Sequence, residues 1–396
     1  MSLKVLYQSR SDLFDIPGGD TFQLNHTKSA IEKKYNDINI DVSTKLHEPR
    51  IDKYDIVHLF NLDWIGETYI QAKWAKKHKK IVVLSAIHHS KKELERYEEL
   101  YRFDIRRIVN FFVPFQGIRD VLKNVYRSMF DYRSFYPTVM QMLKGPYREQ
   151  REIVKMVDSV FVQTKKEVKD IKDDYNIKDF DWELIYNGVD FEKFEKAKKE
   201  DFVNQMKSEY GLDVLDKKII LNVGRIEARK NQLSLIQAFL ELKKKKGYKD
   251  YLLVFIGGIN RHHPEYLYRF KNIVNQNKDI YYLGLRKQEF VASCMKSSFM
   301  YVHPSWFETT GLVCLEAMYS GLKVIATGER TREYLGSNAL YCDPASVESI
   351  VDAIMKIKDF KPNAQSMLGL KTKYSWDKTA VQTVKAYEKL YKIKRN

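Results

Sequence analysis

Cysteine is scarce in this chain of 396 residues. The three cysteines, Cys294, Cys314 and Cys342, are odd in number, scattered and outside any C-x-x-C pair. This pattern argues against a disulfide framework and against a zinc site. No run approaches the roughly 18 apolar residues that a membrane span requires, and Met1–Gln8 lacks the apolar stretch of a secretion signal. We therefore expect a cytoplasmic protein without a transmembrane helix.

The chain also lacks any RNP or zinc-finger pattern, although its net charge is +16. Residues 191–396 carry +13 of this charge. A basic surface suits nucleic acid, anionic lipid or phosphorylated ligands, but the first of these needs a binding signature that is missing. We expect no nucleic-acid partner, and we interpret Lys243–Lys246 as a solvated helix end.

Short apolar, β-branched runs alternate with amphipathic stretches, which favours α/β domains with parallel sheets. The expected strands are Leu3–Gln8, Ile38–Ser43, Asp55–Phe60, Ile81–Ala86, Ser159–Gln163 and Glu183–Tyr186, then Lys218–Val223, Tyr251–Ile256, Ile280–Leu283, Phe299–His303 and Lys323–Ala326. A connection rich in lysine and glutamate separates the two sets. We expect two Rossmann-like, doubly wound domains, residues 1–190 and 191–376, that face each other across a cleft.

The first expected strand is followed by Pro17-Gly18-Gly19-Asp20 and a helical stretch. Adjacent glycines let the backbone approach a phosphate closely, with a helix N-terminus behind them. A plain turn explains this loop equally well, and the absence of G-x-G-x-x-G counts against a dinucleotide site.

The first strand of the second domain leads into Gly224-Arg225 and then Arg229-Lys230-Asn231. A strand-loop-helix turn of this kind presents positive charge and free amides to one spot. A diphosphate leaving group fits, because Arg and Lys can neutralise its growing charge without a metal. No Asp-x-Asp pair follows a nucleotide-binding strand. The structural alternative is that Arg225 and Lys230 pair with nearby carboxylates such as Glu227.

Two carboxylates eight residues apart, Glu308 and Glu316, flank a helix start that contains Gly311. Amides in the first helical turn lack partners and point, with the helix dipole, at an anion. A carboxylate accepts two hydrogen bonds at once, so Glu316 can hold a ribose and Glu308 a hexose. Paired glutamates near a helix start are also common capping devices.

Together these residues resemble family 4 of the retaining glycosyltransferases, enzymes of GT-B fold. The motifs that match, in the order of the family, are Gly18-Gly19-Asp20-Thr21, Asn187-Gly188-Val189-Asp190, Gly224-Arg225, Arg229-Lys230-Asn231, the E-x7-E pair Glu308 and Glu316, and Tyr374-Ser375-Trp376. The likeness is greatest to bacterial polysaccharide-assembly members. Thr310 departs from the proline or phenylalanine that the family more often has there.

The resemblance implies a donor-binding second domain and an acceptor-binding first domain, to which a C-terminal helix at about 377–396 crosses back. Arg225 and Lys230 would bind the donor diphosphate, and Glu316 the ribose. Glu308 would contact the transferred sugar, and either His88 or His89 would lie beside it. The implied donor site is completed by Gly18, Gly19, Thr309, Gly311, Leu312 and Val313, with backbone near Gly284 and Leu285 for the base.

The implied reaction is retaining, metal-independent transfer from a UDP- or GDP-linked sugar, with no other cofactor, to a saccharide, a lipid-linked acceptor or another acceptor. The role would lie in polysaccharide or glycoconjugate biosynthesis. A nucleotide-sugar epimerase of the same fold and a non-enzymatic polyanion-binding protein are the alternatives. The basic, amphipathic residues 118–133 suggest peripheral contact with the inner face of an anionic membrane, or else a helix packed on its own domain.

Overall fold

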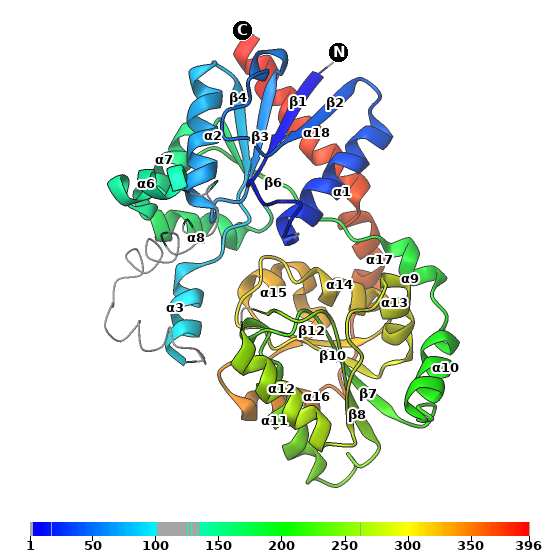
Figure 1. Ribbon diagram of the computed structural model, residues 1–396. Coiled ribbons are helices and arrows are strands. Elements are labelled where there is room, and N and C mark those ends of the chain that lie inside the picture. Colours follow the sequence, from blue (N-terminus) through cyan, green and yellow to red (C-terminus); the bar gives the residue numbers. More distant parts are fainter. Residues whose placement is uncertain are drawn as a thin grey trace. The chain divides into compact units, whose positions relative to one another are not determined.

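The computed structural model describes residues 3–16, 18–100, 125, 128, 133, 135–261 and 263–395 (Figure 1). These residues form two compact units. Unit 1 takes the described residues within 1–91, 108–188 and 374–396, and unit 2 takes those within 92–107 and 189–373. The segment 118–133, with its expected membrane-facing pattern, lies outside the described residues apart from three single positions.

Unit 1 is built on a six-stranded parallel sheet in the order β2-β1-β3-β4-β5-β6. Strands β3, β4 and β5 are buried along their whole length, as expected where helices cover both faces of a parallel sheet. The strands are β1 (Leu3–Gln8), β2 (Ile38–Ser43), β3 (Ile56–Phe60), β4 (Ile81–Ser85), β5 (Ser159–Val162) and β6 (Trp182–Leu184).

Helices cover both faces of this sheet (Figure 1). On one face, α1 (Gly19–Lys34) and α18 (Trp376–Arg395) pack together and share a core with β1. The other core is formed with α2 (Ile65–Lys77), α7 (Pro146–Met156) and α8 (Lys165–Tyr175), and α6 (Phe135–Lys144) lies against α2 and α7. A short 3-10 turn, η1, covers Ile51–Lys53.

Helix α18 is held in unit 1 by a polar contact inside the core. The ring of His58 contacts the Tyr387 hydroxyl through Nδ1 at 2.5 Å and the Ser85 hydroxyl through Nε2 at 2.8 Å. Burial lowers the pKa of His58 to about 3, so the ring is neutral. At the start of α18, a side chain on Gly188 would meet the Trp376 amide nitrogen at 2.3 Å. Only glycine allows this close crossing of two segments.

Unit 2 has a second parallel sheet, in the order β12-β11-β10-β7-β8-β9. Its strands are β7 (Lys218–Val223), β8 (Tyr251–Ile256), β9 (Ile280–Tyr282), β10 (Met300–Val302), β11 (Lys323–Ala326) and β12 (Ala339–Tyr341). Its helices are α3 (Lys91–Leu100, from residue 92), α9 (Phe191–Lys196), α10 (Lys199–Tyr210), α11 (Gln232–Lys243), α12 (Pro264–Gln276), α13 (Gln288–Ser297), α14 (Leu312–Tyr319), α15 (Glu329–Leu335), α16 (Val347–Lys356) and α17 (Ala364–Lys373), with 3-10 turns η3 (Ala228–Lys230) and η4 (Gly336–Asn338).

The prediction of two Rossmann-like parallel sheets is confirmed. Every expected strand exists within a residue or two of its expected bounds, and the edge strand β12 is an addition that the sequence analysis does not predict. The helix α3 joins unit 2 through Tyr97, whose ring lies 5.9 Å from that of Trp306 and 5.8 Å from that of Phe307. Within the described part of the chain, no helix has the length and apolar composition needed to cross a bilayer.

Candidate functional site

In unit 2 the strand order reverses between β7 and β10. Ligands of open α/β sheets bind outside the carboxyl ends of the strands at such a switch point. The loop after β7 carries Gly224 to Lys230, and the loop after β10 carries His303 to Gly311. The topology therefore places the predicted cations and Glu308 on neighbouring loops, with Glu316 in the helix that follows.

Backbone contacts fix these two loops to each other. The Arg229 carbonyl accepts hydrogen bonds from the Trp306 amide at 2.9 Å and from the Ser305 hydroxyl at 3.2 Å. Thr327, at the end of β11, donates its hydroxyl to the Ser305 carbonyl. The sequence offered no sign of these three bonds, since none of them depends on a charged side chain.

The loops after β7, β8 and β9 also meet. Gly257 has a φ of +151°, and a side chain there would lie 2.0 Å from the Gly224 carbonyl oxygen. Its amide donates to the Gly284 carbonyl at 2.9 Å. Gly257 is therefore required for the close approach of three loops, a role that its position after a buried strand could have suggested. Gly284 and Leu285 were expected near the base of the nucleotide. The Gly284 carbonyl accepts the hydrogen bond from Gly257, and the Leu285 side chain is exposed.

The cations of the β7 loop have three different environments. Arg225 is exposed, and Lys230 bonds to Oε1 of Glu308. Arg229, for which no separate role was proposed, contacts Glu227 at 3.0 Å. Lys230 therefore does pair with a carboxylate, as in the structural alternative, but this carboxylate is Glu308, and the ion-pair partner of Glu227 is Arg229.

Glu308 is largely buried and accepts a second hydrogen bond at Oε1, from Nε2 of His303 at 2.8 Å. Burial alone would raise the pKa of the Glu308 carboxyl, but Lys230, His303 and Arg229 together hold it well below its usual range. The carboxylate is therefore ionised. Burial also lowers the pKa of His303, against the opposing effect of Glu308.

Helix α14 starts beside this carboxylate. Gly311, its N-cap, has a φ of +69°, and a side chain there would come within 3.0 Å of Thr331. Among the described residues, none accepts a hydrogen bond from the amides of Thr309, Leu312 or Val313. These amides are consequently available at the N-terminus of the helix. Thr310 is buried and so faces the interior of unit 2.

Glu316 lies on the second turn of α14 and is half-buried. Burial raises the pKa of its carboxyl to about 7. The nearby Lys193 lowers this pKa, and Asp190 raises it by a smaller amount. Both neighbours belong to the start of α9, whose Phe191 ring contacts that of Tyr319 at 4.4 Å. Two residues of the Asn187 to Asp190 motif thus have separate structural roles. Gly188 lets its segment cross closely over the start of α18, and Asp190 lies near Glu316.

In unit 1 the predicted glycine loop lies on a buried ionic cluster. The Arg10 guanidinium bonds to Asp12 at 2.5 Å and to Asp20 at 2.7 Å, and all three side chains are nearly inaccessible. The Gly18 amide donates to the Thr21 hydroxyl at 3.1 Å, and Gly19 begins α1. The loop after β1 is therefore held by an arginine that the motif did not include.

The two candidate histidines follow β4 and differ in environment. His88 is buried, with Nδ1 at 2.6 Å from Asp63 and Nε2 at 2.8 Å from Asp174. Both ring nitrogens of His88 are therefore engaged by carboxylates of unit 1. His89 is partly accessible, and its ring and amide both contact Asp63. Of the pair, His89 is the one whose side chain reaches the surface.

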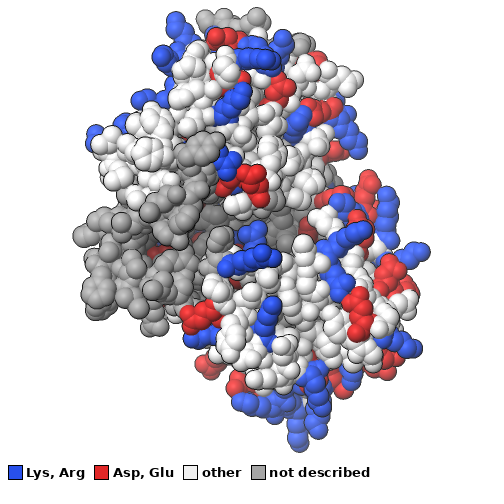
Figure 2. All heavy atoms as spheres, viewed as in Figure 1, with Lys and Arg blue, Asp and Glu red and all other residues white. Residues whose placement is uncertain are grey.

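Charge on the surface is mixed. On the face drawn in Figure 2, Lys and Arg are scattered among Asp and Glu, with one group at the lower end of unit 2. The run Lys243–Lys246 also lies beside acidic residues. Lys243 pairs with Asp279 at 2.9 Å, and Lys244 pairs with Glu241 at 2.6 Å. These pairs lie within unit 2, as expected for a solvated helix end.

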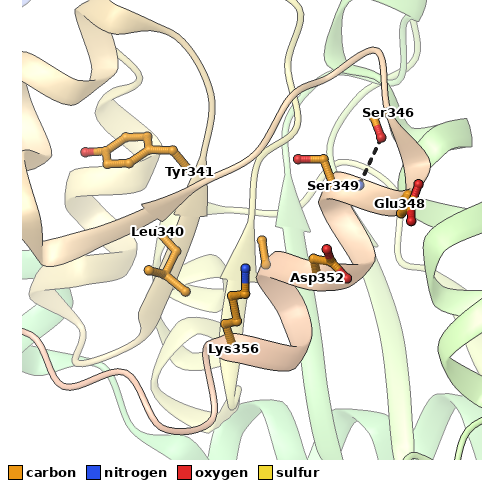
Figure 3. Close-up of a pocket in the computed structure, with 8 residues that line it drawn as sticks. Leu340, Tyr341, Ser346, Glu348, Ser349, Asp352 and Lys356 are labelled. Carbon is orange, nitrogen blue, oxygen red and sulfur yellow. Dashed lines mark hydrogen bonds between the residues drawn. The ribbon is translucent and has the colours of Figure 1, made fainter.

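A surface hollow of ≈ 500 Å³ lies between β12 and α16 (Figure 3). It is lined by Leu340, Tyr341, Ser346, Glu348, Ser349, Asp352, Ala353 and Lys356. The Ser346 hydroxyl caps α16 by accepting a hydrogen bond from the Ser349 amide, so this polar group of the hollow already has a partner. The hollow includes no residue of the β7 or β10 loops and is separate from the candidate site.

The two parallel sheets define a GT-B fold. Residues 207–369 match the model of the family described as Glycosyl transferases group 1. The chain is similar to D-inositol 3-phosphate glycosyltransferase from Corynebacterium urealyticum, with 26% identity over 264 residues that cover 62% of each chain. The alignments with such curated relatives span about three fifths of the relatives' own length.

Solved structures resemble the whole chain. Sucrose-phosphate synthase from Thermosynechococcus elongatus superposes with a TM-score of 0.70 at 14% identity, over 99% of this chain and 100% of the other. HepE from Anabaena, in complex with UDP-glucose, gives a TM-score of 0.66 at 13% identity, over 98% and 100%. At these identities the likeness establishes the fold.

Proposed function

We propose that the protein is a retaining, metal-independent glycosyltransferase that uses a nucleotide-diphosphate sugar. The observation that carries this proposal is the arrangement around Glu308: an ionised carboxylate at a switch point, next to Lys230 and to the free amides of α14. Such a site offers positive charge to a diphosphate and an acceptor to a sugar hydroxyl. The UDP-glucose bound by HepE supports a donor of this class.

Each residue of unit 2 then has a role. Arg225 and Lys230 bind the diphosphate. The amides of Leu312 and Val313, at the positive end of the α14 dipole, help to stabilise its negative charge. Glu316 accepts hydrogen bonds from the ribose hydroxyls. Glu308 binds the transferred sugar, with the Thr309 and Gly311 backbone beside it, and the base lies near the backbone of Gly284 and Leu285.

Unit 1 binds the acceptor. The Gly18-Gly19 loop also lets atoms of the donor approach its backbone, and His89 is the histidine that contacts the reacting sugar or acceptor. His88 keeps its neighbour in place through Asp63, which contacts both rings. The acceptor is a saccharide or a lipid-linked saccharide of polysaccharide or glycoconjugate assembly, consistent with a chain that acts peripherally at the inner face of an anionic membrane.

Transfer requires no protein nucleophile. The bond between the anomeric carbon and the diphosphate oxygen breaks, the acceptor oxygen bonds to the same face of that carbon, and the acceptor proton passes to the leaving phosphate. Catalysis then depends on positioning and on cations that stabilise the departing charge. An epimerase of the same fold is disfavoured, because the relatives found are glycosyltransferases.

Calorimetric titration of the full chain with UDP, UDP-glucose, GDP and GDP-mannose tests the donor class. We expect one nucleotide series to bind, and the nucleotide sugar of that series to release free nucleoside diphosphate in the presence of chelator as its sugar passes to an added saccharide or, more slowly, to water. Anomeric NMR of the product tests retention. Absence of binding to all four compounds, or loss of turnover on chelation, would contradict the proposal. Flotation with anionic liposomes separately tests peripheral membrane contact.

A further inference from the structure

Glu308 lies at the end of a chain of buried side chains that begins on β7. The Tyr301 hydroxyl lies 3.1 Å from the carbonyl oxygen of Val223, the last residue of β7. The same hydroxyl lies 3.0 Å from Nδ1 of His303, and Nε2 of His303 lies 2.8 Å from Oε1 of Glu308. These hydrogen-bonded side chains connect the loop after β10 to the strand that leads into Arg225.

Burial makes these contacts specific. Tyr301 is inaccessible and His303 is 3% exposed, so water does not compete for either side chain. Their rings are stacked, with centroids 5.8 Å apart and an angle of 15° between the planes. The ring of His303 consequently has one orientation, which points Nε2 at the carboxylate.

Hydrogen counting then assigns the proton positions. Glu308 is ionised and can only accept, so Nε2 of His303 carries the hydrogen. The ring is neutral, because burial disfavours the imidazolium and the nearby Lys230 and Arg229 are already positive. Nδ1 is therefore an acceptor. The single hydrogen of the Tyr301 hydroxyl is shared between two acceptors, the Val223 carbonyl oxygen at 3.1 Å and Nδ1 at 3.0 Å, and its contact with Nδ1 favours the Nε2–H tautomer.

The two donors to Glu308 use the same oxygen. Both Lys230 and His303 bond to Oε1. No described residue bonds to Oε2, and this oxygen is not among the fully buried unpaired atoms. The carboxylate is thus held at one oxygen and presents the other to the surface of the loop.

We propose that His303 is a positioning residue of the donor site: its ring, oriented by Tyr301, holds Oε1 of Glu308 so that Oε2 accepts a hydroxyl of the donor sugar. The inference rests on the proposed function and extends it to two residues for which no role was assigned. It predicts a selective defect, since His303 supports the contact with the sugar and has none with the nucleotide.

The test compares two ligands on each variant by calorimetric titration: a nucleoside diphosphate and its sugar conjugate, from whichever of the UDP/UDP-glucose and GDP/GDP-mannose pairs the unmodified chain binds. For His303→Leu we expect the Kd of the sugar conjugate to rise on the order of tenfold, and the Kd of the free diphosphate to stay within about twofold. His303→Gln, whose amide retains an N–H donor, should recover most of the affinity.

Tyr301→Phe tests the tautomer. We expect a smaller loss in the same direction, because the ring keeps its packing but loses its selected hydrogen position. The matched control is Tyr251→Phe, which also deletes a buried hydroxyl in unit 2, but one without a partner. It should change neither Kd.

Three outcomes overturn the inference while the proposed function stands: equal losses for both ligands in His303→Leu, no loss for either, or no recovery in His303→Gln. If the unmodified chain binds neither pair, the proposed function itself fails and the inference fails with it. Poor folding of His303→Leu leaves the decision to His303→Gln and Tyr301→Phe, which preserve size and packing.

Discussion

Units 1 and 2 have similar sheets but use the charges at the carboxyl ends of their strands differently. In unit 1, Arg10 is buried between Asp12 and Asp20, and the His88 ring lies between two aspartates. In unit 2, Arg225 is exposed, and the Lys230–Glu308 pair leaves one carboxylate oxygen unbonded by any described residue. In unit 1 the charged groups are paired with one another inside the fold. In unit 2, Arg225 and one oxygen of Glu308 stay available to a ligand.

The difference follows from the cost of burying charge. An ion in the protein interior must be paired and hydrogen-bonded, so a buried cluster is closed to ligands and strongly sensitive to the loss of one partner. An exposed cation contributes little to folding but can bind an anion strongly when the ligand excludes water. The following predictions test this contrast, from the largest expected effect to the smallest.

Arg10→Met should destabilise unit 1 by about 3 to 5 kcal/mol, because it leaves Asp12 and Asp20 buried without their cation. The measurement is hydrogen exchange of the β1 and β3 amides, which reports the opening of unit 1 alone. Arg225→Met is the control in unit 2 and should change the stability of its sheet by less than about 0.5 kcal/mol. Equal effects of the two substitutions would remove the contrast between the units.

Arg225→Ala should lower the turnover of the nucleotide sugar by roughly tenfold to several hundredfold, since a charged hydrogen bond to the departing diphosphate is lost. Lys230→Ala should lower turnover by a similar factor and also destabilise unit 2, because Glu308 loses its ion-pair partner. Steady-state kinetics and thermal melting of both variants distinguish these effects. Normal turnover in both variants would show that the diphosphate lies elsewhere.

Two buried groups of unit 1 should give opposite dependences of stability on pH. Burial lowers the pKa of His58 to about 3, so its contribution is complete above pH 6.5 and is lost as the pH falls. Burial raises the pKa of Glu149, whose carboxylate oxygens have no partner, to about 7, so its contribution is complete below pH 4.5 and is lost as the pH rises.

Between pH 4.5 and 6.5 the two effects oppose each other, each by up to about 1.4 kcal/mol per pH unit. In Glu149→Gln the stability of unit 1 should therefore rise more steeply with pH than in the unmodified chain, and in His58→Gln it should rise less steeply or fall. Hydrogen exchange of unit 1 at several pH values measures both slopes. Parallel slopes in the two variants would contradict the assignments.

The smallest effect should come from Glu316. Its pKa of about 7 means that the carboxyl is partly protonated in the unbound protein, and a ribose hydroxyl bonds better to the ionised form. Affinity for the nucleoside diphosphate should rise several-fold from pH 6 to pH 8. Glu316→Gln should bind more weakly and show a flatter profile by calorimetry. An unchanged profile in this variant would separate Glu316 from nucleotide binding.

Much of the fold was predictable because buried parallel strands leave continuous apolar runs. The strands Leu3–Gln8 and Tyr251–Ile256 have the expected bounds, whereas the edge strand Ala339–Tyr341 was not predicted. The assignment of α3 to unit 2 was not predictable, since it depends on Tyr97 meeting two aromatic side chains more than 200 residues away.

By itself, the sequence determined the two sheets and the residues that carry charge at the end of β7 and around α14. These follow from periodicity and from motifs, which are local properties of the chain. Only the tertiary structure decided the partners: Arg229 rather than Lys230 for Glu227, two aspartates for His88, and His303 for Glu308. A hydrogen bond depends on distance and direction between atoms, and the order of residues along the chain fixes neither.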